Sequence, residues 1–117
     1  MFEKDMRLAL LLDHYGDLLS EHRRSIMEMY YCEDLSLAEI AENTAITRQG
    51  VRESIKKSEA DLRSFEEKLH LVERFYALQE KCSTYSKILE MSARNIPDDS
   101  DRQSVLEVAD LLKNLSV

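Results

Sequence analysis

Apolar and polar residues alternate at helical intervals through the first third of the chain. The apolar positions between Lys4 and Leu19 recur three or four residues apart, at Met6, Leu8, Leu11, Leu12, Tyr15, Leu18 and Leu19. Gly16 is a weak point in this segment, so the pattern predicts either one helix or two short turns. Ser20 is placed to cap a second helix, which ends near Asp34 and has an apolar face of Ile26, Met27, Met29, Tyr30 and Tyr31.

Two cap signals lie close together in the stretch SLAEIAENTAITRQGV. Ser36 and Glu39 have the spacing of a capping box, and Thr47 can cap a further helix. Two capped helices joined by a short turn predict a helix-turn-helix, in which the small Ala41 allows close approach and Ile40, Ile46, Val51 and Ile55 are buried. Ala45 stands where many such motifs use glycine with positive φ. The turn is therefore expected to be of another type or mildly strained.

A long apolar stripe follows. It runs through Val51, Ile55, Leu62, Phe65, Leu69, Val72 and Tyr76, and a second set continues with a slip in phase through Phe75, Leu78, Cys82, Tyr85 and Leu89. The slip between Val72 and Phe75 predicts the end of one helix and the start of another. No glycine or proline then intervenes before Pro97, so this stripe either folds back on itself or pairs with a second chain, and we favour a homodimer.

The last amphipathic segment follows the loop and cap at Pro97, Asp98, Asp99 and Ser100. Its apolar positions are Val105, Leu106, Val108, Ala109, Leu111, Leu112 and Leu115, and we expect it to pack on the long helix.

Composition agrees with an all-α fold. The chain has 117 residues, 44% of them hydrophobic and 33% charged, with only 2 glycines and 1 proline. We expect two parts: a helix-turn-helix domain over residues 1–70 and a helical, dimerising arm over residues 71–117. No apolar run reaches the roughly 20 residues that span a bilayer, and acids near the amino terminus argue against a signal peptide. These features indicate a cytoplasmic protein without a membrane partner, whose two cysteines, Cys32 and Cys82, are reduced packing thiols.

Charge is distributed unevenly. The segment from Thr47 to Lys57 carries a formal charge of +3. Because the net charge of the chain is -7, the other residues together carry -10. Its four cations are Arg48, Arg52, Lys56 and Lys57, to which Arg23 and Arg24 are possible additions. Because affinity for nucleic acid comes largely from neutralised phosphates, so few cations predict weak binding by one copy at physiological salt.

Other chemistry finds little support in the sequence. The three histidines, His14, His22 and His70, share no helical spacing, and two cysteines form no zinc pattern. With two glycines there is no phosphate-binding loop, and no nucleophile has an orienting acid and base beside it. We therefore expect no catalytic residues, metal or cofactor, and a protein that is not an enzyme.

A resemblance to known families is carried by the segment from Leu18 to Leu62. It is similar to region 4 of bacterial sigma factors, in which S-L-x-E-I-A precedes [ST]-R-x-x-V-R. About two thirds of the chain resembles the YlxM-like family of small helix-turn-helix proteins, known mainly from Gram-positive bacteria and usually encoded beside the GTPase of the signal recognition particle. The most specific stretches are YYCEDLSLAEIAE, TRQGV and IKKSEADL.

The resemblance implies duplex DNA as a partner, and a link to the RNA or GTPase of the signal recognition particle. In sigma region 4 the residues just after the cap enter the major groove. The matching residues are Arg48, Gln49, Arg52 and Glu53, with Thr47, Lys56 and Lys57 available for phosphates. Gly50 departs from the pattern, because primary sigma factors carry a long basic side chain there.

Three functions remain open from sequence. The first is a DNA-binding regulator that reads the major groove with the helix that starts after Thr47. The second is an accessory component of the signal recognition particle that contacts its RNA or its GTPase. The third is a protein-interaction scaffold that no longer binds nucleic acid, which Gly50 and the overall acidity favour.

Overall fold

The computed structural model describes residues 4–115, and the chain divides after Val72 into two compact units. We call residues 4–72 the head and residues 73–115 the arm. Across residues 4–115 the structure contains six α-helices, one 3-10 turn and no strand, which confirms the all-α prediction. In chain order the elements are α1 (Arg7–Tyr15), the 3-10 turn (Gly16–Leu18), α2 (Glu21–Tyr31), α3 (Leu37–Thr44), α4 (Arg48–Leu69), α5 (Leu71–Ala93) and α6 (Asp99–Lys113).

Side-chain caps begin the helices at the positions that the sequence marks. Ser20 Oγ accepts from the backbone N–H of Arg23 at 3.3 Å, and Asp98 Oδ1 accepts from that of Ser100 at 2.9 Å. Ser36 and Glu39 form a complete capping box, with both hydrogen bonds at 3.1 Å. These bonds satisfy amide groups that the helix itself leaves without partners, so they fix where each helix starts.

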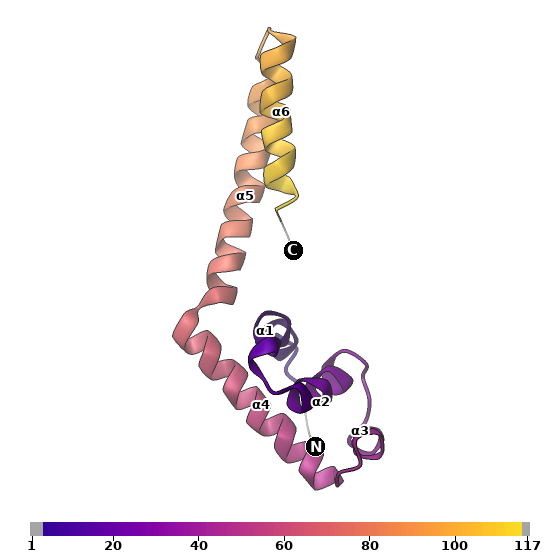
Figure 1. Ribbon diagram of the computed structural model, residues 1–117. Coiled ribbons are helices and arrows are strands. Elements are labelled where there is room, and N and C mark those ends of the chain that lie inside the picture. Colours follow the sequence, from indigo (N-terminus) through magenta and orange to yellow (C-terminus); the bar gives the residue numbers. More distant parts are fainter. Residues whose placement is uncertain (1–3, 116–117) are drawn as a thin grey trace. The chain divides into compact units, whose positions relative to one another are not determined.

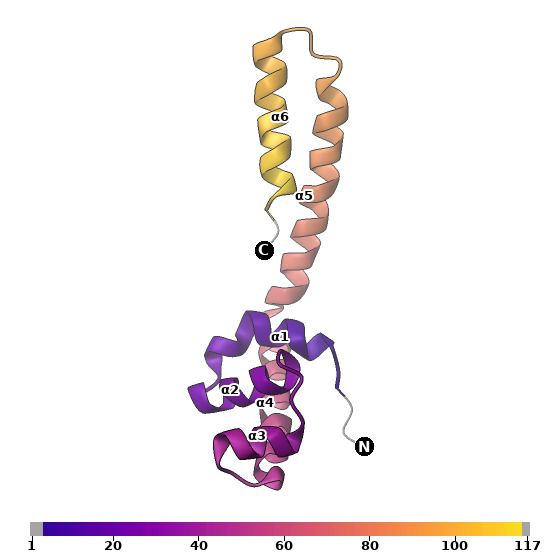
Figure 2. The same ribbon diagram turned by 90° about the vertical axis from the view of Figure 1, so that its right-hand side faces the viewer.

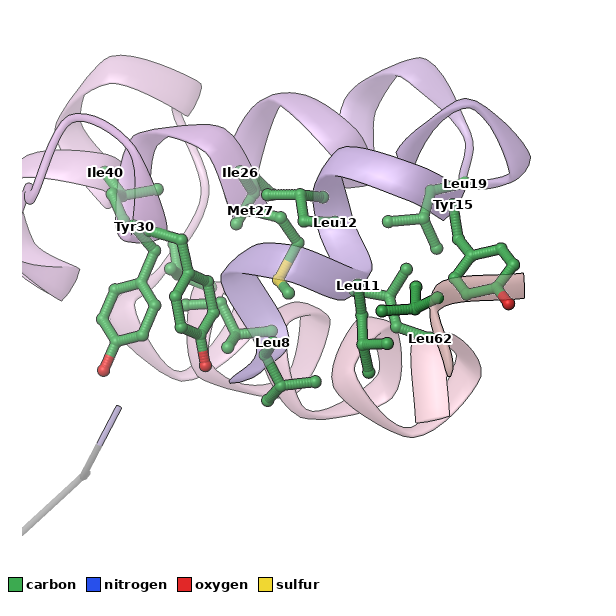
Figure 3. Packing of buried hydrophobic residues seen from close by; sticks show 14 residues of the cluster. Leu8, Leu11, Leu12, Tyr15, Leu19, Ile26, Met27, Tyr30, Ile40 and Leu62 are labelled. Carbon is green, nitrogen blue, oxygen red and sulfur yellow. The ribbon is translucent and has the colours of Figure 1, made fainter. Parts of the chain in front are cut away.

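The head core lies between α4 and the three helices that pack against it (Figure 1). Figure 3 shows its apolar side chains gathered between these helices. Its buried members are Leu8, Leu11, Leu12, Tyr15, Leu19, Ile26, Met27, Tyr30, Tyr31, Ile40, Val51, Ile55, Leu62 and Val72. Each helix therefore contributes the apolar stripe that its spacing predicts.

The long helix breaks at His70, slightly before the predicted phase slip. His70 adopts the left-handed conformation, with φ 55° and ψ 27°, and its N–H bonds the carbonyl of Glu66. The Glu66 carboxylate then accepts from the N–H of Val72 at 3.0 Å and from the Tyr15 hydroxyl, which itself accepts from the N–H of Leu71 at 3.1 Å. Side chains from α1 and α4 thus cap the start of α5.

In the arm, α5 and α6 lie side by side and antiparallel (Figures 1 and 2). Ser86 Oγ donates to the carbonyl of Ala109 at 2.7 Å, and both residues are buried. The less exposed positions of α5 recur three and four residues apart, at Phe75, Gln79, Cys82, Ser86, Leu89 and Ala93. The last helix therefore covers one stripe of α5, as expected, and leaves other apolar residues of both helices exposed.

The two thiols are free, and they differ in exposure. Cys82 is half-buried on the covered stripe of α5, whereas Cys32 follows α2 and is exposed. The expectation of a packing thiol is thus wrong for Cys32, because α2 ends one residue before it and its side chain leaves the core. Within residues 4–115 no helix is both long and apolar enough to cross a bilayer.

Candidate nucleic-acid interface

The two helices of the predicted helix-turn-helix are α3 and α4, joined by residues 45–47. Ile40 on α3 and Val51 and Ile55 on α4 are fully buried, while Ala41 and Ile46 are partly buried against the same core. Ala45 adopts φ 58° and ψ 32°, the left-handed region that glycine occupies most easily. The sequence left open a turn of another type or a mildly strained turn with positive φ at Ala45, and the structure has the strained turn.

The packing of α4 decides which of its side chains face solvent. Val51, Ile55, Ser58 and Leu62 are buried against the rest of the head. The exposed residues of its first turns are Arg48, Gln49, Arg52, Glu53, Lys56 and Lys57, and Thr47 immediately before them is exposed too. The structure thus brings all the predicted site residues onto the start and outer side of one helix.

The start of α4 favours negative ligands. Thr47 Oγ1 accepts from the N–H of Gly50 at 2.9 Å, which leaves the hydroxyl hydrogen of Thr47 able to donate. Glutamate or aspartate lies in the first turn of α2, α3, α5 and α6, whereas α4 has no acid there and begins with Arg48. The partial positive charge of the helix N-terminus is therefore not neutralised by the helix's own side chains.

Hydrogen bonds already occupy part of this surface. Gln49 Nε2 donates to Glu53 Oε1 at 3.2 Å, so Gln49 must release that bond to read an adenine with both ends of its amide. In the described chain, residues 4–115, the side chains of Arg48, Lys56 and Lys57 make no hydrogen bond or ion pair. These three cations can therefore turn to a ligand without breaking an internal contact.

Comparison with known proteins agrees with this geometry. The family model of YlxM/p13-like helix-turn-helix proteins, UPF0122, matches residues 2–110. The chain belongs to the UPF0122 family. UPF0122 proteins of Bacillus cereus strain AH187, Bacillus anthracis strain A0248 and Bacillus thuringiensis subsp. konkukian are each 38% identical to it over 112 residues, covering 96% of this chain and 99% of each relative. Family membership confirms the predicted resemblance to YlxM-like proteins and the helix-turn-helix.

Two cations that the sequence offered to the interface of this UPF0122 chain are held elsewhere. Arg23 donates to Ser58 Oγ at 3.0 Å and to Asp61 Oδ2 at 2.7 Å, which ties α2 to α4. Arg24 pairs with Asp17 at 2.6 Å and with Glu28 at 2.9 Å. Neighbouring carboxylates compensate the charges of Arg23 and Arg24, so these two arginines are weaker candidates for phosphate contacts than the cations of α4.

A signal for the structural role of Arg23 was present in the sequence. Ile26 and Met27 lie three and four positions after Arg23 and are fully buried, so all three share one face of α2. An arginine on a core-facing stripe needs a polar partner on the facing helix. Ser58 and Asp61, beside Leu62 on α4, supply it.

Proposed function

We propose that this chain is a DNA-binding regulatory protein that acts in the cytoplasm and inserts the start of α4 into the major groove, in the manner of sigma region 4. The observation that carries the proposal is the exposed, capped start of α4, which holds four cations and no first-turn acid. Helix-turn-helix proteins place the first residues of their second helix against base edges. Here those residues are not needed for the core of the head.

The chemistry of each side chain suggests its part. Arg48 and Gln49 lie nearest the start of α4 and can bond base edges, while Arg52 can bond either a base or a phosphate. Thr47 is placed for a phosphate through its hydroxyl hydrogen, and the two lysines, Lys56 and Lys57, add phosphate contacts. Glu53 can accept from a cytosine amino group if it releases Gln49.

A homodimer completes the proposal, because four cations make a small electrostatic footprint. The logarithm of affinity falls with the logarithm of salt concentration with a slope of about -0.9 for each neutralised phosphate. Three phosphate contacts, from Arg52, Lys56 and Lys57, thus give a slope of roughly -3 for one head, and two heads bound together give roughly -5. Pairing two heads raises affinity without new side chains, since the second head binds at high effective concentration.

The test is a salt titration of fluorescence anisotropy on duplex DNA from the gene's own chromosomal neighbourhood. We expect sequence-dependent binding that an Arg48→Ala/Arg52→Ala variant loses. The matched control is Lys68→Ala/Lys87→Ala, which removes two exposed charges that do not belong to the first turns of α4. Lys56→Ala/Lys57→Ala is expected to weaken binding to all sequences and to reduce the slope by about 2 per head.

Three results would overturn the proposal. Tighter binding to signal recognition particle RNA or to its GTPase, lost in the same variants, would instead identify an accessory component of that particle. No binding to any of these partners by folded protein, shown by unchanged helical circular dichroism, would leave the interaction scaffold as the function. Equal loss in the control variant would show that only total charge matters.

A further inference from the structure

We propose that two copies of the chain pair through one apolar face of the arm, in parallel, so that both α5 helices start at the same end of a four-helix bundle. This inference rests on the proposed homodimer and specifies its contact. The face comprises residues of α5 and α6 outside the stripe that joins them. Its most exposed side chains are Leu78, Tyr85, Ile88, Val108 and Leu115, which are 49% to 61% exposed, and the half-buried Val105 and Leu112 lie beside them.

Helical spacing places these residues on the same side of the hairpin. Ser86 and Ala109 are in contact, so each marks the side of its helix that faces the other helix. Tyr85 precedes Ser86 by one residue and Val108 precedes Ala109 by one residue, so each is rotated by about 100° from that side in the same sense along its chain. Because the helices are antiparallel, the same rotation carries both side chains to one side of the hairpin. On its other side most positions are polar and exposed, among them Ser83, Glu90, Gln103 and Asp110, and Leu106 is the apolar exception on α6.

A second copy fits this face better than a charged partner does. The face carries few charges near its apolar residues, the cations Arg74 and Lys81 and the anion Asp101, so it has little charge with which to hold a polyanion. A largely apolar face of low charge is complementary to itself. Twofold dimers with an isologous interface are also the commonest soluble homo-oligomers.

The order of residues along the face favours parallel pairing. Ser86 and Ala109 are level with one another, because the Ser86 hydroxyl bonds the Ala109 carbonyl. We call residues of α5 and α6 that lie at the same height along the hairpin a level, counted from Ser86 and Ala109 to within two residues. Three levels hold apolar residues from both helices: Leu78 with Leu115, Tyr85 with Leu112, and Ile88 with Val108. Nearer the loop the levels are polar, with Ser92 beside Ser104 and Asn95 beside Asp101.

A twofold axis along the bundle brings each level against the same level of the other copy. Apolar levels then meet apolar levels and the polar levels near the loop meet each other, and α5 of one copy lies across from α6 of the other. In an antiparallel pair α5 would lie across from α5, and full overlap of the hairpins would set the apolar levels against the polar end. Sliding the copies to avoid this would uncover half of α6.

The first experiment measures mass by light scattering across a concentration series. Wild type is expected to be a dimer, and Val108→Glu is expected to weaken dimerisation at least about a hundredfold, since the twofold axis buries the new carboxylate twice. Gln103→Glu places the same residue on the polar side of α6 and is expected to leave the dimer intact. A wild-type monomer at all concentrations would refute the homodimer itself, and a dimer indifferent to Val108→Glu would refute only the face.

The second experiment tests direction by disulfide cross-linking, with Cys32→Ser and Cys82→Ser as background. Parallel pairing predicts that a mixture of Ile88→Cys and Val108→Cys proteins forms a mixed disulfide, because α5 faces the α6 of the other copy. The single variant Tyr85→Cys is expected not to cross-link to itself. Efficient self-linking of Tyr85→Cys, without the mixed product, would establish antiparallel pairing and overturn the inference while leaving the dimer.

Discussion

Replacing Tyr15 by phenylalanine tests how the head holds the start of α5. Tyr15 is 1% exposed, and its ring packs in the head core while its hydroxyl serves two hydrogen bonds. It donates to the Glu66 carboxylate at 2.5 Å and accepts from the N–H of Leu71 at 3.1 Å. Phenylalanine keeps the ring and removes only the oxygen.

The expected loss of stability follows from these two bonds. A hydrogen bond to a charged group contributes about 1.5–3 kcal/mol and a neutral one about 0.5–1.5 kcal/mol. Glu66 is 6% exposed and keeps the N–H of Val72 as a donor, so part of its desolvation remains compensated. We therefore expect Tyr15→Phe to lower the free energy of unfolding by about 2–4 kcal/mol.

Urea unfolding followed by circular dichroism measures this loss, with hydrogen exchange of the Leu71 amide as a local readout. Ser83→Ala removes an exposed hydroxyl on the polar side of α5 and is expected to change stability by less than about 0.5 kcal/mol. A double-mutant cycle with Glu66→Gln is expected to show coupling of at least about 0.5 kcal/mol. A Tyr15→Phe effect as small as that of Ser83→Ala would refute this account of the junction.

Three further predictions concern backbone strain and ionisation. Ala45→Gly is expected to stabilise the head by up to about 1 kcal/mol in urea unfolding, because relief of the left-handed strain outweighs the added entropy of the unfolded chain; a loss of stability would contradict this. Gly50→Ala is expected to stabilise the head by up to about 1 kcal/mol through helix propensity. The new Cβ would lie 3.2 Å from Thr47 Oγ1, but α3 accommodates the larger Glu39 at the same third helical position after its cap. Thermal unfolding of Ala45→Gly and Gly50→Ala, each compared with wild type, measures the two effects. Burial, with the nearby Glu66 and Glu59, raises the pKa of Tyr15 and Tyr31. The stability from keeping these hydroxyls protonated is complete below pH 10 and is lost as pH rises above it; a pH series of unfolding is expected to fall more gently above pH 10 for Tyr31→Phe than for wild type.

Local signals made much of the head predictable. Ser20, Ser36 and Thr47 begin helices through bonds that reach only three residues along the chain, so sequence spacing contains the whole of each motif. The same holds for the outer side of α4, because Val51 and Ile55 mark its buried side and the remaining positions follow.

Interactions between distant residues set the features that sequence reasoning missed. The break at His70 depends on Tyr15, which lies 56 residues before Leu71 in the bond that joins them. The neutralisation of Arg23 depends likewise on Asp61, 38 residues away. Helical periodicity records which face of a helix is apolar, but not which partner meets a polar group on that face.

The bonds at the start of α5 also determine where the chain can be divided. A fragment that stops at Leu69, the last residue of α4, lacks the two amide donors that Tyr15 and Glu66 receive from the next turn. Its buried carboxylate would have to find water, at a cost to the fold of the fragment. An autonomous head thus has to carry the first residues of the following helix, through Val72, because their amides complete the hydrogen bonds of Tyr15 and Glu66 inside the head.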